Sequence, residues 1–117
     1  MNKNIIFHNP RCSKSRQTLE LLKEKGIEIE IVEYLENPPS KEDLKFICEK
    51  LGVDPIKLIR IKENIFKELN LTVEDERSDD NWMEIMLKNP ALIERPIVVY
   101  NKKVALGRPP ENVLAII

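Results

Sequence analysis

The fold is decided by the stretch of residues 4–16, which reads Asn4-Ile5-Ile6-Phe7-His8-Asn9-Pro10-Arg11-Cys12-Ser13-Lys14-Ser15-Arg16. It begins with a short β-prone run that Pro10 ends. From Ser13 onward the pattern is helical, and Gly26 stands where that helix is expected to stop. Cys12 is therefore predicted to lie at the junction between a first strand and a first helix.

Beyond this first helix, the pattern predicts a second strand and then a helical middle. Residues 27–31 alternate between isoleucine and glutamate, which is the period of a strand. Ser40 opens a capping-box pattern, so a helix is expected from there to Gly52. Shorter helices are expected up to Pro90, with residues 74–80 as a charged surface loop.

The last part of the chain predicts a hairpin and a final short helix. Residues 97–100 are an uninterrupted apolar run, as in a central strand, and Asn101-Lys102 can turn the chain into residues 103–106. The order is then β-α-β, a helical middle, a β-hairpin and a helix. Such an order predicts an α/β fold with a small mixed sheet.

Length and composition indicate a soluble globular protein. With 117 residues, we expect one domain over residues 1–117. The net charge of -1 favours neither nucleic acid nor an anionic membrane as a partner. No apolar run approaches the roughly 18 residues of a membrane span, and the run in residues 1–7 is too short for a signal peptide. We therefore expect a cytoplasmic protein, in which thiol chemistry suits at least one of the two cysteines better than a structural disulfide.

Cys12 is the candidate nucleophile. At a strand-to-helix junction its sulfur would lie near the unpaired N–H groups of the first helical turn, which favour a thiolate. Arg11, Lys14 and Arg16 add positive charge nearby in the sequence. Such surroundings lower a cysteine pKa to roughly 3.5–7.5, and the same N–H groups could hold a tetrahedral oxyanion. The alternative is a buried spectator cysteine in a tight turn.

The remaining cysteine and the histidine are less distinctive. Cys48 shares a helical face with leucine and isoleucine, so it is expected in the core, with a resolving role as the alternative. Ser15 occupies the second position of a Cys-x-x-Cys motif, so any reductant must come from outside. His8, four residues before Cys12, could stabilise the thiolate or could be a strand-end histidine with a backbone partner. One histidine and two cysteines do not make a zinc site, so no metal is expected.

Three arginines lie at the ends of predicted elements: Arg60, Arg95 and Arg108. Planar guanidinium groups that converge from separate loops would suit a dianionic oxyanion. Sequence spacing alone favours three ordinary surface arginines. Arg95 precedes Pro96, where a cis peptide can form. The Cys-x5-Arg loop of phosphatases is absent, because Thr18 occupies its arginine position.

Five segments resemble, in the same order, motifs of the glutaredoxin-coupled arsenate reductase (ArsC) family. They are His8-Asn9-Pro10-Arg11-Cys12-Ser13-Lys14-Ser15-Arg16, Tyr34-Leu35-Glu36-Asn37-Pro38-Pro39, Leu58-Ile59-Arg60, Glu94-Arg95-Pro96-Ile97-Val98-Val99 and Gly107-Arg108-Pro109. The resemblance covers essentially the whole chain. It implies a thioredoxin-like mixed β-sheet flanked by helices, with a helical insertion, and a cis peptide before Pro96.

The resemblance also implies an activity and a set of site residues. Cys12 matches the family's nucleophile, and His8 matches the histidine that helps to ionise it. Arg60, Arg95 and Arg108 match the three oxyanion-binding arginines. The implied enzyme is an arsenate reductase in which glutathione, as co-substrate, reduces a Cys12–arsenate adduct and a glutaredoxin resolves the mixed disulfide. We expect no bound cofactor and a monomer.

The chain departs from well-characterised arsenate reductases, which have Cys-Gly-Thr-Ser-Arg where this chain has Ser13 and Lys14. It also lacks the C-terminal extension of longer members, and it is most similar to a shorter branch named by similarity. One alternative is therefore a thiol oxidoreductase of the same family that takes another oxyanion or a glutathione adduct. A second is a regulator resembling the Spx branch, which binds RNA polymerase. Ser15 removes the Cys-x-x-Cys switch common in that branch, and the matched arginines favour an oxyanion enzyme.

Overall fold

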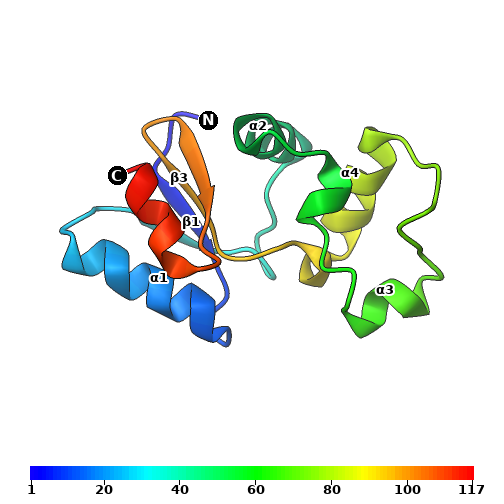
Figure 1. Ribbon diagram of the computed structural model, residues 1–117, viewed down its shortest axis with the longest axis horizontal. Helices are drawn as coiled ribbons and strands as arrows, with labels where there is room; N and C mark the ends of the chain where they lie inside the picture. Colours follow the sequence, from blue (N-terminus) through cyan, green and yellow to red (C-terminus); the bar gives the residue numbers. More distant parts are fainter. The chain divides into compact units, whose positions relative to one another are not determined.

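The computed structural model describes all 117 residues and shows two compact units (Figure 1). The first unit contains residues 1–37 and 95–117, and the second contains residues 38–94. All four strands belong to the first unit, whereas the second is helical. The helical insertion implied by the family resemblance is thereby confirmed, and the expectation of one domain over residues 1–117 stays a prediction.

The first unit is built on a four-stranded mixed sheet in the order β2-β1-β3-β4. Its strands are β1 (Ile5–His8), β2 (Glu30–Glu33), β3 (Ile97–Tyr100) and β4 (Lys103–Leu106). β1 is parallel to β2 and antiparallel to β3, which forms a hairpin with β4. Asn101 and Lys102 turn this hairpin with φ of 49° and 64°, as a two-residue turn between twisted strands requires. The predicted small mixed sheet is confirmed.

The strand predicted over residues 27–31 is wrong by a few residues. Helix α1 (Ser13–Glu24) ends in a left-handed Gly26, with φ of 69°. Gly26 N donates to Lys23 O and Ile27 N donates to Leu22 O, both at 3.0 Å, which is the Schellman pattern of a helix C-terminus. Ile27 is therefore held by the helix end, and pairing with β1 begins only at Glu30.

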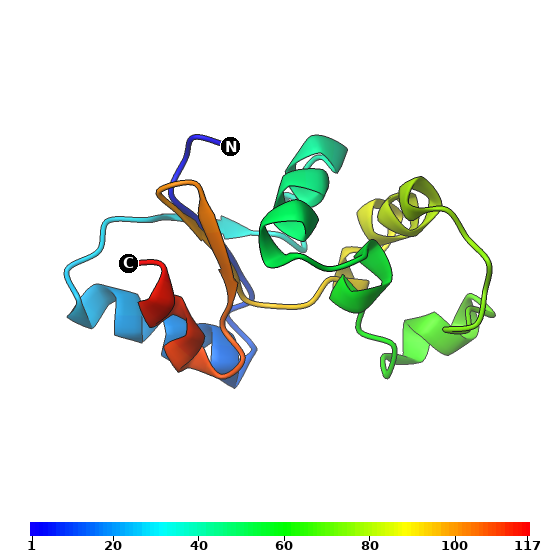
Figure 2. The same cartoon turned by 45° about the horizontal axis from the view of Figure 1, so that its top comes forward.

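One face of the sheet carries α1 and the C-terminal 3-10 helix η3 (Pro110–Ala115), side by side in both ribbon views (Figures 1 and 2). Ile6, Val98 and Ala105 from three strands pack there with Leu22 of α1, Val113 of η3 and Ile116, which directly follows η3. These six side chains are all at most 9% exposed. Their burial fixes α1 against the sheet and so places its N-terminus beyond the end of β1.

The second unit contains α2 (Lys41–Leu51), η1 (Pro55–Leu58), α3 (Asn64–Glu68), α4 (Asp79–Lys88) and η2 (Pro90–Leu92). The predicted capping box is present, because Asp43 N donates to Ser40 Oγ and Ser40 N donates to Asp43 Oδ2. An isolated antiparallel bridge joins Ile59 to Ile93. The surface loop that was expected over residues 74–80 ends at Ser78, which caps α4. Asp79 and Asp80 lie in the first turn of that helix. Carboxylates are favoured there by the positive end of the helix dipole.

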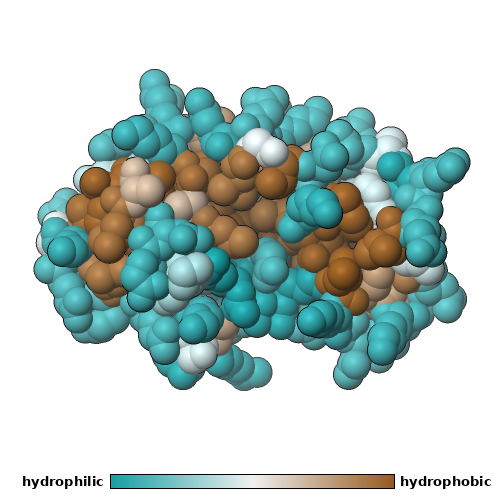
Figure 3. Space-filling view, in the orientation of Figure 1, coloured by the Kyte–Doolittle hydropathy of each residue, from teal (hydrophilic) through white to brown (hydrophobic).

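The surface of each unit mixes hydrophilic and hydrophobic side chains (Figure 3). Exposed large apolar side chains are few in each unit, among them Leu114 in the first and Val73 in the second. No helix of the protein has both the length and the apolar character that crossing a membrane requires.

Candidate active site

Cys12 is the N-cap of α1, at the end of a turn that leaves β1. Its N–H donates to Asn9 O and its carbonyl accepts from Arg16 N, both at 3.0 Å. Its backbone is extended, with φ of -94° and ψ of 124°, as an N-cap requires. The first N–H groups of a helix have no intrahelical partner, so a half-buried sulfur at this position faces unpaired donors. The predicted junction is confirmed.

The register of the sheet brings two of the three candidate arginines to Cys12. Phe7 pairs with Ile97, and Ile97 pairs with Leu106, so β1 ends where β3 begins and β4 ends. Arg95 therefore lies just before β3 and Arg108 just after β4, at the end of the sheet where the chain turns toward Cys12. Cys12, Arg95 and Arg108 are far apart in the sequence, yet they converge at one end of the sheet.

Both guanidinium groups reach the sulfur. Arg108 Nη1 lies 4.0 Å from Cys12 Sγ. The Arg95 side chain hydrogen-bonds the same sulfur. The Arg95-Pro96 peptide is cis, as the resemblance implied, and so is the Arg108-Pro109 peptide. Two forked donors beside one nucleophile form an arrangement that can bind a tetrahedral oxyanion.

The pKa of Cys12 is lowered from its ordinary value. Burial raises this pKa, but the backbone N–H of Ser15, the charge of Arg95, the N–H of Lys14 and the Arg95 hydrogen bond outweigh it. All of these donors stabilise the negatively charged sulfur and have no comparable interaction with the neutral thiol. The thiolate is the nucleophilic form of cysteine, so Cys12 is activated without a dedicated base.

His8 lies behind Ser15, and its ring contacts that residue. The His8 side chain is 6% exposed, and its Nδ1 is 2.6 Å from Ser15 Oγ. Burial lowers the His8 pKa, the Glu33 carboxylate partly offsets this effect, and the charges of Lys23 and Arg16 lower it further. At neutral pH the ring is therefore neutral, so the Ser15 hydroxyl can donate to Nδ1. Any influence of His8 on Cys12 then passes through Ser15.

Ser15 is the residue whose contribution the sequence did not reveal. In the sequence, Ser15 indicated only that the second cysteine of a Cys-x-x-Cys motif is missing. In the structure its fully buried hydroxyl also accepts the N–H of Asn9 at 3.0 Å, while its own N–H stabilises the Cys12 sulfur. A signal that could have indicated this role is the combination of a histidine at the end of a strand, His8, with a serine in the first turn of the next helix, Ser15.

Arg60 belongs to the second unit. It follows η1, and its N–H donates to Leu92 O at 2.7 Å. Its guanidinium forms an ion pair with Glu63, and Nη1 donates to Ala91 O at 3.4 Å. Within the first unit the cluster therefore consists of Cys12, Arg95 and Arg108, with the Ser15–His8 pair behind the sulfur.

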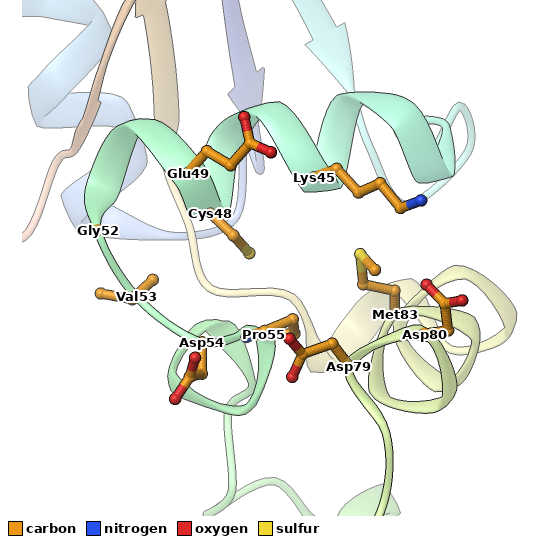
Figure 4. Close-up of a pocket in the computed structure, with 10 residues that line it drawn as sticks. All are labelled: Lys45, Cys48, Glu49, Gly52, Val53, Asp54, Pro55, Asp79, Asp80 and Met83. Carbon is orange, nitrogen blue, oxygen red and sulfur yellow. The ribbon is translucent and has the colours of Figure 1, made fainter.

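Cys48 is buried in the second unit, as its pattern predicted. Its thiol faces a pocket of about 510 Å³ between α2, η1 and α4 (Figure 4). Burial, followed by the charges of Asp79 and Asp54, raises the pKa of Cys48 to about 11. At neutral pH this thiol is protonated and a poor nucleophile. No group of three or more histidine, cysteine or acidic side chains in the structure is arranged to hold a metal ion.

Comparison with known proteins supports this description. The model of the ArsC family matches residues 7–116. The uncharacterised protein YfgD of Escherichia coli K12 is 50% identical over 119 aligned residues, which span 100% of this chain and 99% of YfgD. A protein of Neisseria meningitidis serogroup A named arsenate reductase is 47% identical over 96% of each chain. The solved structure of an arsenate reductase from Vibrio cholerae superimposes with a TM-score of 0.90 at 48% identity, over 97% of each chain. The predicted fold is thereby confirmed.

Proposed function

Because this chain belongs to the ArsC family, we propose that it is an arsenate reductase with Cys12 as its nucleophile. The observation that carries this proposal is the Cys12 sulfur, which has a lowered pKa and lies against the side chains of Arg95 and Arg108. A thiolate beside two guanidinium groups suits attack on a dianionic oxyanion, since the arginines also offset the repulsion between the two anions.

The first step is substitution at arsenic without a change of oxidation state. The Cys12 thiolate forms a sulfur–arsenic bond, and one arsenic–oxygen bond breaks to release hydroxide, or water once that oxygen is protonated. Arg95 and Arg108 hold the remaining oxygens and stabilise the charge that develops on them. Arg60 matches the third oxyanion-binding arginine of the family motif, and its part in binding arsenate stays a prediction.

The second step is the reduction. The thiol of glutathione attacks the adduct, and the sulfur–arsenic electron pair passes to arsenic, which falls from the pentavalent to the trivalent state. Cys12 and glutathione each supply one electron and are left joined as a mixed disulfide, while arsenite leaves. A glutaredoxin thiolate then attacks the glutathione sulfur and releases Cys12. An external reductant fits this chain, because Ser15 replaces a second motif cysteine and Cys48 is protonated.

His8 acts in this scheme as a positioning residue. A neutral ring that accepts the Ser15 hydroxyl keeps Ser15 in place, and the Ser15 N–H then stays directed at the thiolate. The proposal also includes a cytoplasmic monomer with no bound cofactor, in which glutathione and glutaredoxin are transient partners.

Arsenate-dependent oxidation of NADPH tests the proposal when it is coupled through glutathione reductase, glutathione and a glutaredoxin. We expect saturable activity with the unmodified chain and none with Cys12→Ser. Cys48→Ala is the matched control, because it removes the other thiol and should retain the activity. Activity that survives in Cys12→Ser would exclude Cys12 as the nucleophile.

Another oxyanion or a glutathione adduct is the second candidate for the same site. Lys14 favours it, because this residue adds a positive charge to the active-site loop at a position where well-characterised arsenate reductases have threonine. Replacing arsenate by other oxyanions, or by a glutathionylated peptide, in the same coupled assay distinguishes the two. A substrate turned over far more efficiently than arsenate would replace it in the proposal.

A further inference from the structure

Gly107 lies where three segments of the first unit come too close for a side chain. A Cβ atom at this position would be 2.5 Å from Thr18 Oγ1, 2.7 Å from Pro96 Cγ and 3.0 Å from Thr18 Cγ2. The first two distances are much shorter than non-bonded contacts between heavy atoms allow. The φ of Gly107 lies outside the left-handed region, so close approach, and not backbone conformation, requires glycine here.

Hydrogen bonds reinforce this contact. Gly107 N donates to Pro96 O at 2.9 Å. The Thr18 hydroxyl lies 2.8 Å from Lys14 O and 3.4 Å from Gly107 O, and it can donate its hydrogen to either carbonyl oxygen. Thr18 is fully buried, and Pro96 and Gly107 are buried as well. The three residues therefore have little freedom to shift relative to one another.

Each member of this contact adjoins a residue of the proposed site. Thr18 is on α1, whose N-cap is Cys12, and it hydrogen-bonds the first turn of that helix at Lys14. Pro96 directly follows Arg95, and Gly107 directly precedes Arg108. A change in the spacing of the three segments is thus passed directly to the nucleophile and to the two arginines beside it.

We propose that the Thr18–Pro96–Gly107 contact is a positioning element that sets the distance of Arg95 and Arg108 from the Cys12 sulfur. Thr18 and Gly107 are its positioning residues. Arg108 Nη1 is already 4.0 Å from Sγ, at the long limit of a hydrogen bond to sulfur, so a small outward shift of the loop removes that bond. The role in arsenate binding rests on the proposed function, whereas the role in stabilising the thiolate does not.

Two substitutions loosen or spread the contact. Gly107→Ala forces Thr18 or Pro96 away, and Thr18→Ala removes both atoms that face Gly107. Thr18→Ser retains the hydroxyl and is the conservative variant. Ile6→Val is the matched control, because it removes one methylene from the core of the same unit and leaves Thr18, Pro96 and Gly107 themselves unchanged.

The primary readout is the pKa of Cys12 in the full chain, measured from the pH dependence of its alkylation by iodoacetamide well below the melting temperature. We expect Gly107→Ala and Thr18→Ala to raise this pKa by about 0.5–1 unit, since part of the stabilisation by opposite charge is lost. Thr18→Ser and Ile6→Val should leave it unchanged. The second readout is the KM for arsenate in the coupled assay, which should rise about 10-fold in the first two variants with a smaller change in kcat.

The two readouts separate the two proposals. A raised Cys12 pKa in a chain that does not reduce arsenate would retain the positioning element and discard the substrate. If Gly107→Ala does not fold, Thr18→Ala alone decides the outcome. A folded Thr18→Ala protein with a lower melting temperature but an unchanged Cys12 pKa would overturn the inference, because the contact would then serve stability only.

Discussion

Arg108 offers the sharpest quantitative test of the site, since its distance from the nucleophile is known. Arg108→Gln removes a positive charge whose Nη1 lies 4.0 Å from Cys12 Sγ. Two unit charges at about 4 Å interact by about 1 kcal/mol in water and about 4 kcal/mol at the effective dielectric constant of a protein surface. Arg108 is exposed, so the value for water is the appropriate one. About 1 kcal/mol corresponds to roughly 0.7 pKa unit.

The assay is the pH dependence of Cys12 alkylation at low ionic strength, with thiolate absorbance as an independent measure. We expect the Cys12 pKa to rise by roughly 0.7 unit in Arg108→Gln, and the difference to shrink at about 1 M salt, where the Debye length is about 3 Å. Lys103→Gln is the matched control. It removes one charge from the exposed start of β4, at the opposite end of the sheet from Cys12.

Equal pKa values in Arg108→Gln and Lys103→Gln would refute this reasoning. Such a result would mean that the Arg108 guanidinium does not stabilise the thiolate, and only Arg95 and the helix N-terminus would remain to do so. A shift that persists at high salt would also contradict the estimate, since the interaction is assigned to an exposed pair.

Three further predictions concern groups around the two cysteines. Burial lowers the pKa of His8 in the folded chain. As the pH falls below about 6.5, the histidine of the unfolded chain is protonated before that of the folded chain, so the free energy of unfolding decreases. Urea unfolding at pH 7.5 and at pH 5 should therefore show a larger loss for the unmodified chain than for His8→Gln, and equal losses would exclude this linkage. Ser15→Ala leaves the N–H of Asn9 and Nδ1 of His8 without their partner and should lower the free energy of unfolding by about 1–3 kcal/mol, as measured by urea titration. No loss would mean that water replaces the hydroxyl. Iodoacetamide at pH 7.5 should modify Cys12 alone in the folded chain and also Cys48 in urea, as read by peptide mass spectrometry, because Cys48 is buried with a pKa of about 11. Equal labelling of both thiols in the folded chain would contradict the structure.

Local signals explain most of what the sequence could predict. Pro10, Ser13 and Gly26 act within a few residues of themselves, and the first strand, the first helix and the position of Cys12 were predicted from them. The start of β2 depends on whether Ile27 bonds to the end of α1 or pairs with β1, and the periodicity of residues 27–31 does not decide between the two. The Schellman bond from Ile27 to the end of α1 removes this residue from the strand that its alternation suggests.

The site could be predicted only in part, because it is assembled from distant segments. Spacing alone favoured ordinary surface arginines at 95 and 108. The hairpin register and the pairing of β1 with β3 bring both to Cys12, and these are tertiary facts that no local pattern carries. The family resemblance identified the arginines, but neither it nor the spacing indicated the Ser15–His8 pair or the close contact at Gly107.

The proposed function requires that Cys12 reduce arsenate with glutathione through a mixed disulfide. The most direct test incubates the chain with arsenate and glutathione, without glutaredoxin, and identifies the modified peptide by mass spectrometry. We expect one glutathione on the Cys12 peptide, which appears only when arsenate is present and disappears on addition of a reduced glutaredoxin. Glutathione that attaches equally without arsenate, or that is found on Cys48, would contradict it.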